Sequence, residues 1–213
     1  MLYNYICIEG NIGAGKTSLA TKIAADTQAK LILERFEDNS FLPKFYENPR
    51  QYAFPLELSF LADRYQQLKE QLTSELFVPF TISDYFIAKS LIFAQKTLES
   101  DEFTLYRRLF DIIISALPKP DLYVYLYVDI EKLKRNISKR GRTYEQNIQP
   151  EYLEKIQAGY LDYFKYIPEQ RILIIDVNNI DFVNNADDYR LITETIFKPY
   201  DKGLHRVILK NAT

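Results

Sequence analysis

The sequence predicts an α/β fold of three layers, in which helices cover both faces of a central parallel sheet of five strands. Short apolar runs alternate with longer segments of helical periodicity, and this alternation is typical of a parallel sheet. The glycine-rich segment Gly10–Thr17 follows the first apolar run and matches G-x-x-x-x-G-K-[ST], the pattern of a P-loop between a strand and a helix. The 213 residues, 47% of them hydrophobic, suit a full core, so we expect residues 1–213 to form a single P-loop domain.

The five expected strands are apolar runs of strand length, at Tyr3–Glu9, Lys30–Leu33, Phe77–Ser83, Leu122–Val128 and Arg171–Val177. Apolar residues in the intervening segments have helical spacing, which predicts helices at Lys16–Asp26, Pro43–Ser74, Tyr85–Glu99, Phe103–Leu117, Ile130–Arg140, Glu151–Tyr166 and Asn185–Tyr200. The second of these has the clearest pattern, an apolar stripe with alternating spacings of four and three at Phe54, Leu58, Leu61, Tyr65, Leu68 and Leu72. Such a stripe indicates core packing.

The P-loop pattern predicts binding of a nucleoside triphosphate. Its glycines let successive backbone N–H groups turn toward phosphates, Lys16 reaches the β- and γ-phosphates, and the Thr17 hydroxyl ligates Mg²⁺. The helix that begins near Lys16 adds its positive dipole end. The expected phosphate-binding residues are Gly10, Asn11, Ile12, Gly13, Ala14, Gly15, Lys16, Thr17 and Ser18.

Two acidic residues close expected strands beside this loop. Glu34 follows the second strand, and Asp84 follows the third. Because ligands of parallel sheets bind at the carboxyl ends of the strands, both are candidates for chemistry, and Asp84 is the candidate second ligand of Mg²⁺ beside Thr17. Either acid alone could instead cap a helix or lie on the surface.

One face of the long helix carries Glu57, Phe60 and Arg64, and Glu57 and Arg64 are two turns apart. A carboxylate and a guanidinium that flank an aromatic ring could form a solvated ion pair. They could also bind the edge of a nucleobase.

A basic cluster follows the fourth strand, with Arg140-Gly141-Arg142 at its centre and Glu145 shortly after. Guanidinium groups suit a transferring phosphoryl group, whose charge is spread over three oxygens, and a glycine supplies a hinge. The cluster therefore predicts an arginine lid, although basic residues also favour the solvated end of any helix.

Composition limits the possible partners. Acidic and basic residues are interspersed and the net charge is −2, so the chain lacks the basic surface expected of a protein that binds nucleic acid polymers or anionic membranes. The apolar runs are too short to cross a membrane, and the single cysteine, Cys7, excludes an internal disulfide. We expect a cytoplasmic protein with small-molecule partners.

Several motifs, in order along the chain, resemble one family. They are Ile8–Thr17, Glu34, Phe45-Tyr46-Glu47-Asn48-Pro49, the helix with Glu57 and Arg64, Ile92-Phe93-Ala94, Arg140-Gly141-Arg142, Glu145-Gln146, Pro150–Lys155 and Asp176-Val177-Asn178. Together they resemble the deoxyribonucleoside kinases, the salvage enzymes of the deoxycytidine, deoxyguanosine and deoxyadenosine kinase type. The resemblance implies a P-loop kinase that uses ATP and Mg²⁺ and forms a homodimer.

The resemblance also implies residue roles. Glu34 corresponds to the catalytic base for the sugar 5′-hydroxyl, and Lys16, Arg140 and Arg142 complete the catalytic set. The turn Asn178–Phe182 corresponds to the loop beside the adenine of ATP, and its expected ATP-binding residues are Asn178, Asp181 and Phe182. The residues expected around the acceptor nucleoside are Glu34, Tyr46, Glu57, Phe60, Arg64, Asp84, Phe93 and Glu145.

The sequence departs from the family pattern in three places. The arginine expected after the third strand is missing from Ser83-Asp84-Tyr85, and Arg35 or Lys89 is expected to replace it. Lys89 also stands where the family has an acid that braces the base-reading arginine. Glu57 stands where the family commonly has glutamine. A carboxylate only accepts hydrogen bonds, which favours base edges rich in N–H donors.

The reaction we expect is transfer of the γ-phosphate of ATP to the 5′-hydroxyl of a purine deoxynucleoside, deoxyadenosine or deoxyguanosine. One alternative is a nucleoside monophosphate kinase of the thymidylate type, although Glu34 would repel the acceptor phosphate. Another is a P-loop switch protein that binds without phosphorylating a small molecule. The chain has no Asn-Lys-x-Asp motif to bind guanine, and a switch needs no arginine lid.

Overall fold

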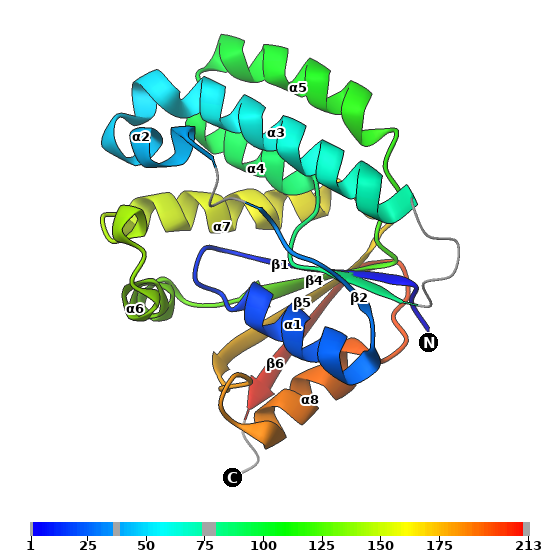
Figure 1. The fold of residues 1–213 in the computed structure, drawn as a ribbon. Helices are drawn as coiled ribbons and strands as arrows, with labels where there is room; N and C mark the ends of the chain where they lie inside the picture. Colours follow the sequence, from blue (N-terminus) through cyan, green and yellow to red (C-terminus); the bar gives the residue numbers. More distant parts are fainter. Residues whose placement is uncertain (1, 36–38, 74–79, 211–213) are drawn as a thin grey trace.

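The computed structural model describes residues 2–35, 39–73 and 80–210. Its centre is a sheet of six parallel strands in the order β2-β3-β1-β4-β5-β6, with helices on both faces (Figure 1). The strands are β1 Tyr5–Gly10, β2 Lys30–Ile32, β3 Thr81–Ser83, β4 Leu122–Tyr127, β5 Arg171–Asn179 and β6 Gly203–Lys210. The three-layer α/β prediction is confirmed, whereas the expected count of five strands is wrong by one. Residues 77–79 of the expected third strand lie outside the described residues.

The additional strand, β6, pairs with the outer edge of β5. Its side chains alternate: Val207 and Leu209 pack toward the core, whereas Arg206 and Ile208 are exposed. With only one covered face, the segment has the polar residues His205 and Arg206 between its apolar ones, and so its sequence does not resemble that of the buried central strands.

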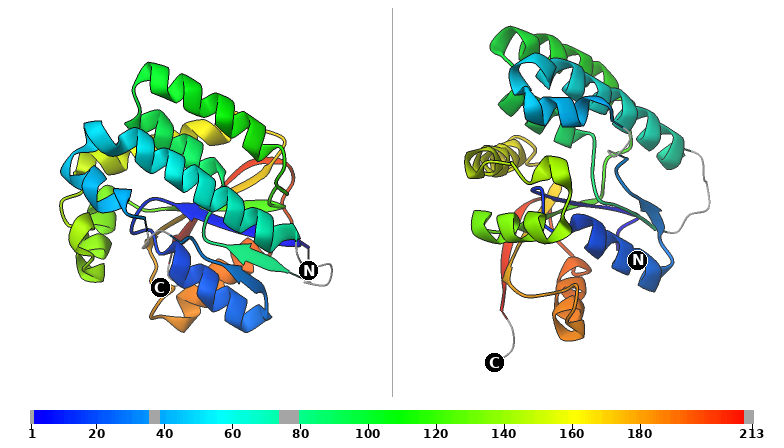
Figure 2. Two further views of the ribbon diagram at one scale, coloured as in Figure 1. Left: turned by 45° about the horizontal axis from the view of Figure 1, so that its top comes forward. Right: turned by 60° about the vertical axis from the view of Figure 1, so that its left-hand side comes forward.

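Eight α-helices surround the sheet in the described part of the chain. They are α1 Lys16–Thr27, α2 Phe41–Glu47, α3 Pro49–Thr73, α4 Ala88–Thr97, α5 Ser100–Ile114, α6 Ile130–Arg140, α7 Pro150–Lys165 and α8 Ala186–Ile196. Helices α1 and α8 lie on one side of the sheet, and α3, α4, α5 and α7 lie on the other (Figures 1 and 2). None of the described helices is both long enough and apolar enough to cross a membrane.

The side-chain alternation of β1 divides the interior into two cores. Ile6 and Ile8 pack in the core that includes α1 and α8, whereas Tyr5 and Cys7 pack in the core under α4, α5 and α7. Both faces of this strand are thus buried, as expected for the centre of a parallel sheet.

The expected long helix Pro43–Ser74 is two helices. Helix α2 ends at Glu47, and α3 begins at Pro49 after Asn48, which has φ −141° and ψ 79°. The residue before a proline is disfavoured in the helical region, while proline itself is well tolerated in a first turn. This break places α2 across the end of α3, where both line one wall of the site described below.

Candidate active site

The phosphate loop is the turn from β1 into α1. Gly13 and Gly15 have φ values of 82° and 89°, a region that favours glycine, and the Lys16 ammonium donates to the carbonyl of Asn11 at 2.9 Å. The Asn11 amide donates to the carbonyl of Leu153 at 2.7 Å, which ties the loop to α7. Of the expected phosphate-binding residues, Gly13 to Ser18 line a cavity of about 930 Å³, Ile12 lines a second, smaller cavity, and Gly10 and Asn11 line neither.

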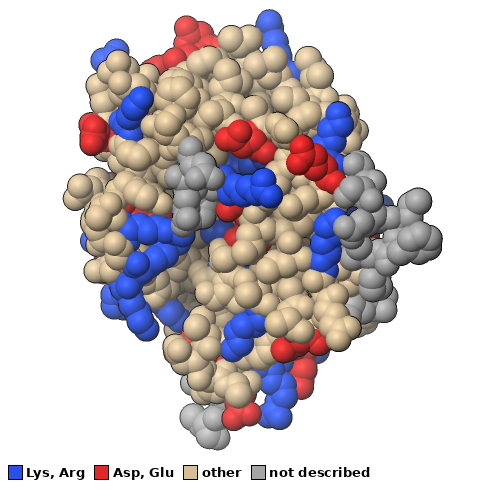
Figure 3. Space-filling model, in the orientation of Figure 1, with Lys and Arg blue, Asp and Glu red and all other residues tan. Residues whose placement is uncertain are grey.

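The wall of this larger cavity is basic. It includes Arg35, Lys132, Lys139, Arg140 and Arg142, and Figure 3 shows lysine and arginine side chains around a hollow in the surface. Such a surface attracts a polyanion such as a triphosphate.

The turn after β5 closes the far end of the larger cavity. Asp181 and Phe182 line it, and the ammonium groups of Lys22 and Lys132 donate to carbonyl oxygens of this turn. Asn178 lines neither cavity, because its side chain is hydrogen-bonded to Asp176 and to the backbone of Asp129.

Thr17 and Asp84 meet as the sequence suggested. The Thr17 hydroxyl donates to Oδ2 of Asp84 at 2.5 Å, and the backbone N–H of Glu34 donates to Oδ1 at 2.8 Å. Asp84 therefore fixes the start of α1 relative to the end of β2. Among the described residues no group of three or more His, Cys, Asp or Glu side chains could hold a metal ion on its own.

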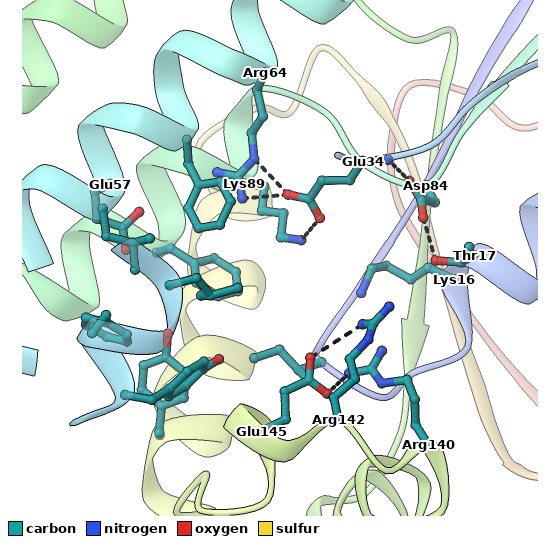
Figure 4. A pocket seen from close by; sticks show the side chains of 18 residues that line it. Lys16, Thr17, Glu34, Glu57, Arg64, Asp84, Lys89, Arg140, Arg142 and Glu145 are labelled. Carbon is teal, nitrogen blue, oxygen red and sulfur yellow. Dashed lines mark hydrogen bonds and ion pairs between the residues drawn. The ribbon is translucent and has the colours of Figure 1, made fainter. Parts of the chain in front are cut away.

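Glu34 lies where the two cavities meet and is held by two cations (Figure 4). Its Oε1 accepts from Nε and Nη2 of Arg64 at 2.8 and 2.6 Å, and its Oε2 accepts from Lys89 at 2.5 Å. Burial alone would raise the pKa of Glu34, but the charges of Lys89 and Arg64 outweigh it and lower the pKa to about 2. The side chain is therefore ionised at neutral pH.

The smaller cavity, of about 100 Å³, extends from Glu34 toward α2, α3 and α7. Its wall combines aromatic and charged side chains, and contains all eight residues that the sequence suggested for the acceptor. The lining residues are Ile12, Lys16, Thr17, Glu34, Leu42, Phe45, Tyr46, Leu56, Glu57, Phe60, Arg64, Asp84, Lys89, Phe93, Arg140, Arg142, Glu145 and Tyr152.

Glu57 is at the opposite end of this cavity from Lys16 (Figure 4). Its side chain is buried, Oε1 lies 2.9 Å from the Thr97 hydroxyl, and Oε2 has no hydrogen-bond partner within the described ranges. Burial raises the pKa of Glu57 to about 7, although the charge of Arg64 and the Thr97 hydrogen bond lower it. The three nitrogens of the Arg64 guanidinium each donate to Glu34 or Ser90.

The expected lid arginines meet Glu145 in the wall of this cavity. Nη2 of Arg140 donates to Oε2 of Glu145, and Nη1 of Arg142 lies 3.5 Å from Oε1 (Figure 4). Tyr46, the second residue suggested for the sugar 3′-hydroxyl, stacks on Tyr144 with ring centroids 6.1 Å apart. The structure thus brings Tyr46, Glu145 and both arginines to one wall.

Sequence reasoning missed the role of Thr97. It named Lys89 as one of two substitutes for an arginine and as the replacement of an acid near Arg64, but not as a partner of Glu34. Lys89, Phe93 and Thr97 are spaced by four residues on α4, so they share one helical face, and Lys89 and Phe93 line the smaller cavity. This spacing is visible in the sequence. Arg35, the other suggested substitute, lines the larger cavity only.

Comparisons with known proteins agree with this geometry. The family model for deoxynucleoside kinases matches residues 6–199. A deoxyguanosine kinase of Bacillus subtilis is 38% identical over 88% of this chain and 93% of its own length, and a deoxyadenosine kinase of Dictyostelium discoideum is 30% identical over 84% and 74%. A solved deoxyadenosine kinase from M. mycoides with bound dATP has a TM-score of 0.78, 22% identity, and coverage of 91% of this chain and 100% of the other, which shows the shared fold. The chain belongs to the deoxynucleoside kinase family.

Proposed function

We propose that this chain transfers the γ-phosphate of ATP to the 5′-hydroxyl of a purine deoxynucleoside, as a step of nucleotide salvage. The observation that carries the proposal is the position of Glu34, which lines both the basic cavity behind the phosphate loop and the aromatic cavity beside it. Curated relatives named deoxyguanosine kinase and deoxyadenosine kinase support the substrate class.

The hydrogen bonds of Glu34 indicate which of its two oxygens acts as the base. An ionised carboxylate offers about four acceptor sites, and Arg64 fills both sites of Oε1 with two donors. Lys89 fills one site of Oε2, so the second site of Oε2 remains for the 5′-hydroxyl. Its proton passes to Oε2 as the hydroxyl oxygen attacks the γ-phosphorus, and ADP leaves.

Positive charge then stabilises the transferring group. Lys16, Arg140 and Arg142 line both cavities. When the lid closes, the two arginines would exchange their ion pairs with Glu145 for contacts with the phosphoryl oxygens. Release of Glu145 in the same movement would let it bind the 3′-hydroxyl together with Tyr46.

The residues at the phosphate loop fit Mg²⁺. This ion prefers oxygen ligands and is commonly held by one or two protein groups together with phosphates and water, and the contact between Thr17 and Asp84 provides a hydroxyl and a carboxylate. When bound, Mg²⁺ would neutralise charge on the β- and γ-phosphate oxygens.

For the two bases we propose separate sites. Phe182, Asp181 and Asn178 belong to the turn that we assign to the adenine of ATP, whereas Phe60, Phe93, Arg64 and Glu57 surround the acceptor base. We further propose that residues 1–213 act as a single domain, in a cytoplasmic homodimer.

The test is incubation with γ-labelled ATP and Mg²⁺ and a panel of acceptors: the four common deoxynucleosides, 2′,5′-dideoxyguanosine, and deoxyguanosine 5′-monophosphate. We expect label on deoxyguanosine and deoxyadenosine and none on the 5′-deoxy compound or the monophosphate. Lys16→Ala should abolish the transfer, because the Lys16 ammonium lines both cavities at the phosphate loop and would stabilise the transferring phosphoryl group. Labelling of the monophosphate in place of the nucleosides would contradict the proposal and favour a nucleoside monophosphate kinase.

A further inference from the structure

The buried carboxyl of Glu57 has surroundings suited to two protonation states. It lies in the cavity that we assign to the acceptor base, no cation contacts it among the described residues, and its Oε2 has no hydrogen-bond partner there. A buried polar atom without a partner is rare in proteins and calls for an explanation, such as a ligand that completes the hydrogen bond.

The Thr97 hydroxyl suits either state. Its oxygen lies 2.9 Å from Oε1 of Glu57 and 3.0 Å from the carbonyl oxygen of Phe93, one turn earlier on α4. A hydroxyl has one proton to donate but rotates to suit its neighbours. It can donate to an ionised Glu57, and it can turn to the Phe93 carbonyl when Glu57 carries a proton of its own.

Other groups near Glu57 do not fix its state. The charged groups are Arg64 on the same helix, Lys89 on α4 and Glu34 beyond them, and the first two are bound to Glu34. The phenols that face it from α2, α5 and α7 are those of Tyr46, Tyr106 and Tyr152, and burial holds the pKa of each above the ordinary value. These phenols stay neutral near pH 7, so Glu57 is the group in this wall whose charge changes there.

We propose that Glu57, oriented by Thr97, accepts both purines, as a carboxylate for guanine and as a neutral acid for adenine. This inference rests on the proposed function. Guanine presents N1–H and N2–H₂ side by side, so two carboxylate oxygens accept both hydrogen bonds. Adenine presents the N1 acceptor beside N6–H₂, which matches a carboxylic acid that donates from Oε2 and accepts at Oε1. The protonation state of Glu57 thereby determines which of the two bases it binds.

The consequence is a substrate preference that depends on pH. The ratio of kcat/KM for deoxyguanosine to kcat/KM for deoxyadenosine follows the ratio of ionised to neutral Glu57. It should rise about tenfold per pH unit between about pH 6 and pH 8. Titration of Glu9 or Lys16 does not alter this ratio, because these residues lie under and in the phosphate loop and act on both substrates alike. Deoxyinosine, which keeps N1–H but lacks the 2-amino group, should follow the deoxyguanosine trend.

The experiment measures both efficiencies across this pH range in the wild-type chain and three variants. Glu57→Gln should give a ratio that does not change with pH. Thr97→Val removes a hydrogen bond that favours the ionised form, so the same slope should be displaced to higher pH. Thr104→Val, a matched change at an exposed position on α5, should behave as the wild type.

A flat ratio in the wild type would overturn the inference, and so would a slope that survives in Glu57→Gln. Both outcomes leave the proposed function intact, because the deoxynucleosides are still phosphorylated. If no deoxynucleoside were phosphorylated at any pH, the proposed function would be wrong and this inference with it.

Discussion

Two buried glutamates at opposite ends of one cavity have opposite electrostatic surroundings. Glu34 accepts three hydrogen bonds from Arg64 and Lys89, which lower its pKa to about 2, whereas Glu57 has one hydroxyl neighbour and a pKa raised by burial to about 7. Both are at least 90% buried. Burial therefore does not decide the charge of these carboxyl groups; their hydrogen-bond partners do.

The difference matches the two tasks that we assign. A group that must accept a proton in each turnover is kept ionised by cations that are already in place. A group that binds a base edge retains an oxygen without a partner until the base arrives.

The largest expected effect comes from Glu34→Gln. The amide keeps the size of the side chain but cannot accept the 5′-hydroxyl proton, so kcat should fall by about 10²–10⁴-fold while nucleoside KM changes much less. Steady-state kinetics with the best deoxynucleoside at saturating ATP measures this. Glu57→Gln is the matched change at the other end, and its kcat for that substrate should fall less. A loss below about fivefold in Glu34→Gln would assign the base to another residue, with Asp84 as the next candidate.

A second prediction uses stability to measure the charge at Glu57. The folded chain keeps a proton on Glu57 up to about pH 7, whereas the unfolded chain releases it near the ordinary value of 4.5. The folded state therefore binds more protons between these values, and the contribution of Glu57 to stability is lost as the pH rises through this window. This shift corresponds to about 3 kcal/mol over the full window.

Denaturant unfolding of wild type and Glu57→Gln at several pH values tests this. The free energy of unfolding of the variant minus that of the wild type should increase from pH 4.5 to 7. Glu9, whose pKa burial also raises, is present in both proteins and cancels in the difference. A difference that stays constant over this range would mean that Glu57 has no raised pKa.

The sequence predicted this site unevenly. The P-loop was predicted from its motif, and Glu34 and Asp84 from strand ends, because parallel topology alone brings those positions to one edge of the sheet. The lid arginines were predicted from a basic cluster at the end of a helix. Strand β6 was missed because a half-covered edge strand carries polar side chains between its apolar ones, and its register depends on β5.

The partners of the two glutamates depend on packing between helices, which no local pattern encodes. Lys89 follows a strand end closely in sequence, yet its contact with Glu34 depends on where α4 lies relative to the segment after β2. The Thr97 contact with Glu57 joins α4 to α3. Helical spacing indicates that Lys89, Phe93 and Thr97 share one face of α4, but it does not indicate which side chains of other elements contact that face.

The smallest expected effect, and the most specific to this chain, is that of Lys89→Met. Lys89 is the cation on Oε2, the oxygen that we assign to the 5′-hydroxyl, and it is one of the two charges that lower the pKa of Glu34. Its removal should lower kcat about tenfold at neutral pH and move the acidic limb of the kcat profile to higher pH, because Glu34 would then protonate more easily. Lys89→Arg should retain most of the activity, and Lys96→Met is the matched control, since Lys96 lies on the same helix but lines neither cavity. If Lys89→Met and Lys96→Met have the same kcat profile, the low pKa of Glu34 is due to Arg64 alone, and the contrast between the two glutamates depends on one cation rather than two.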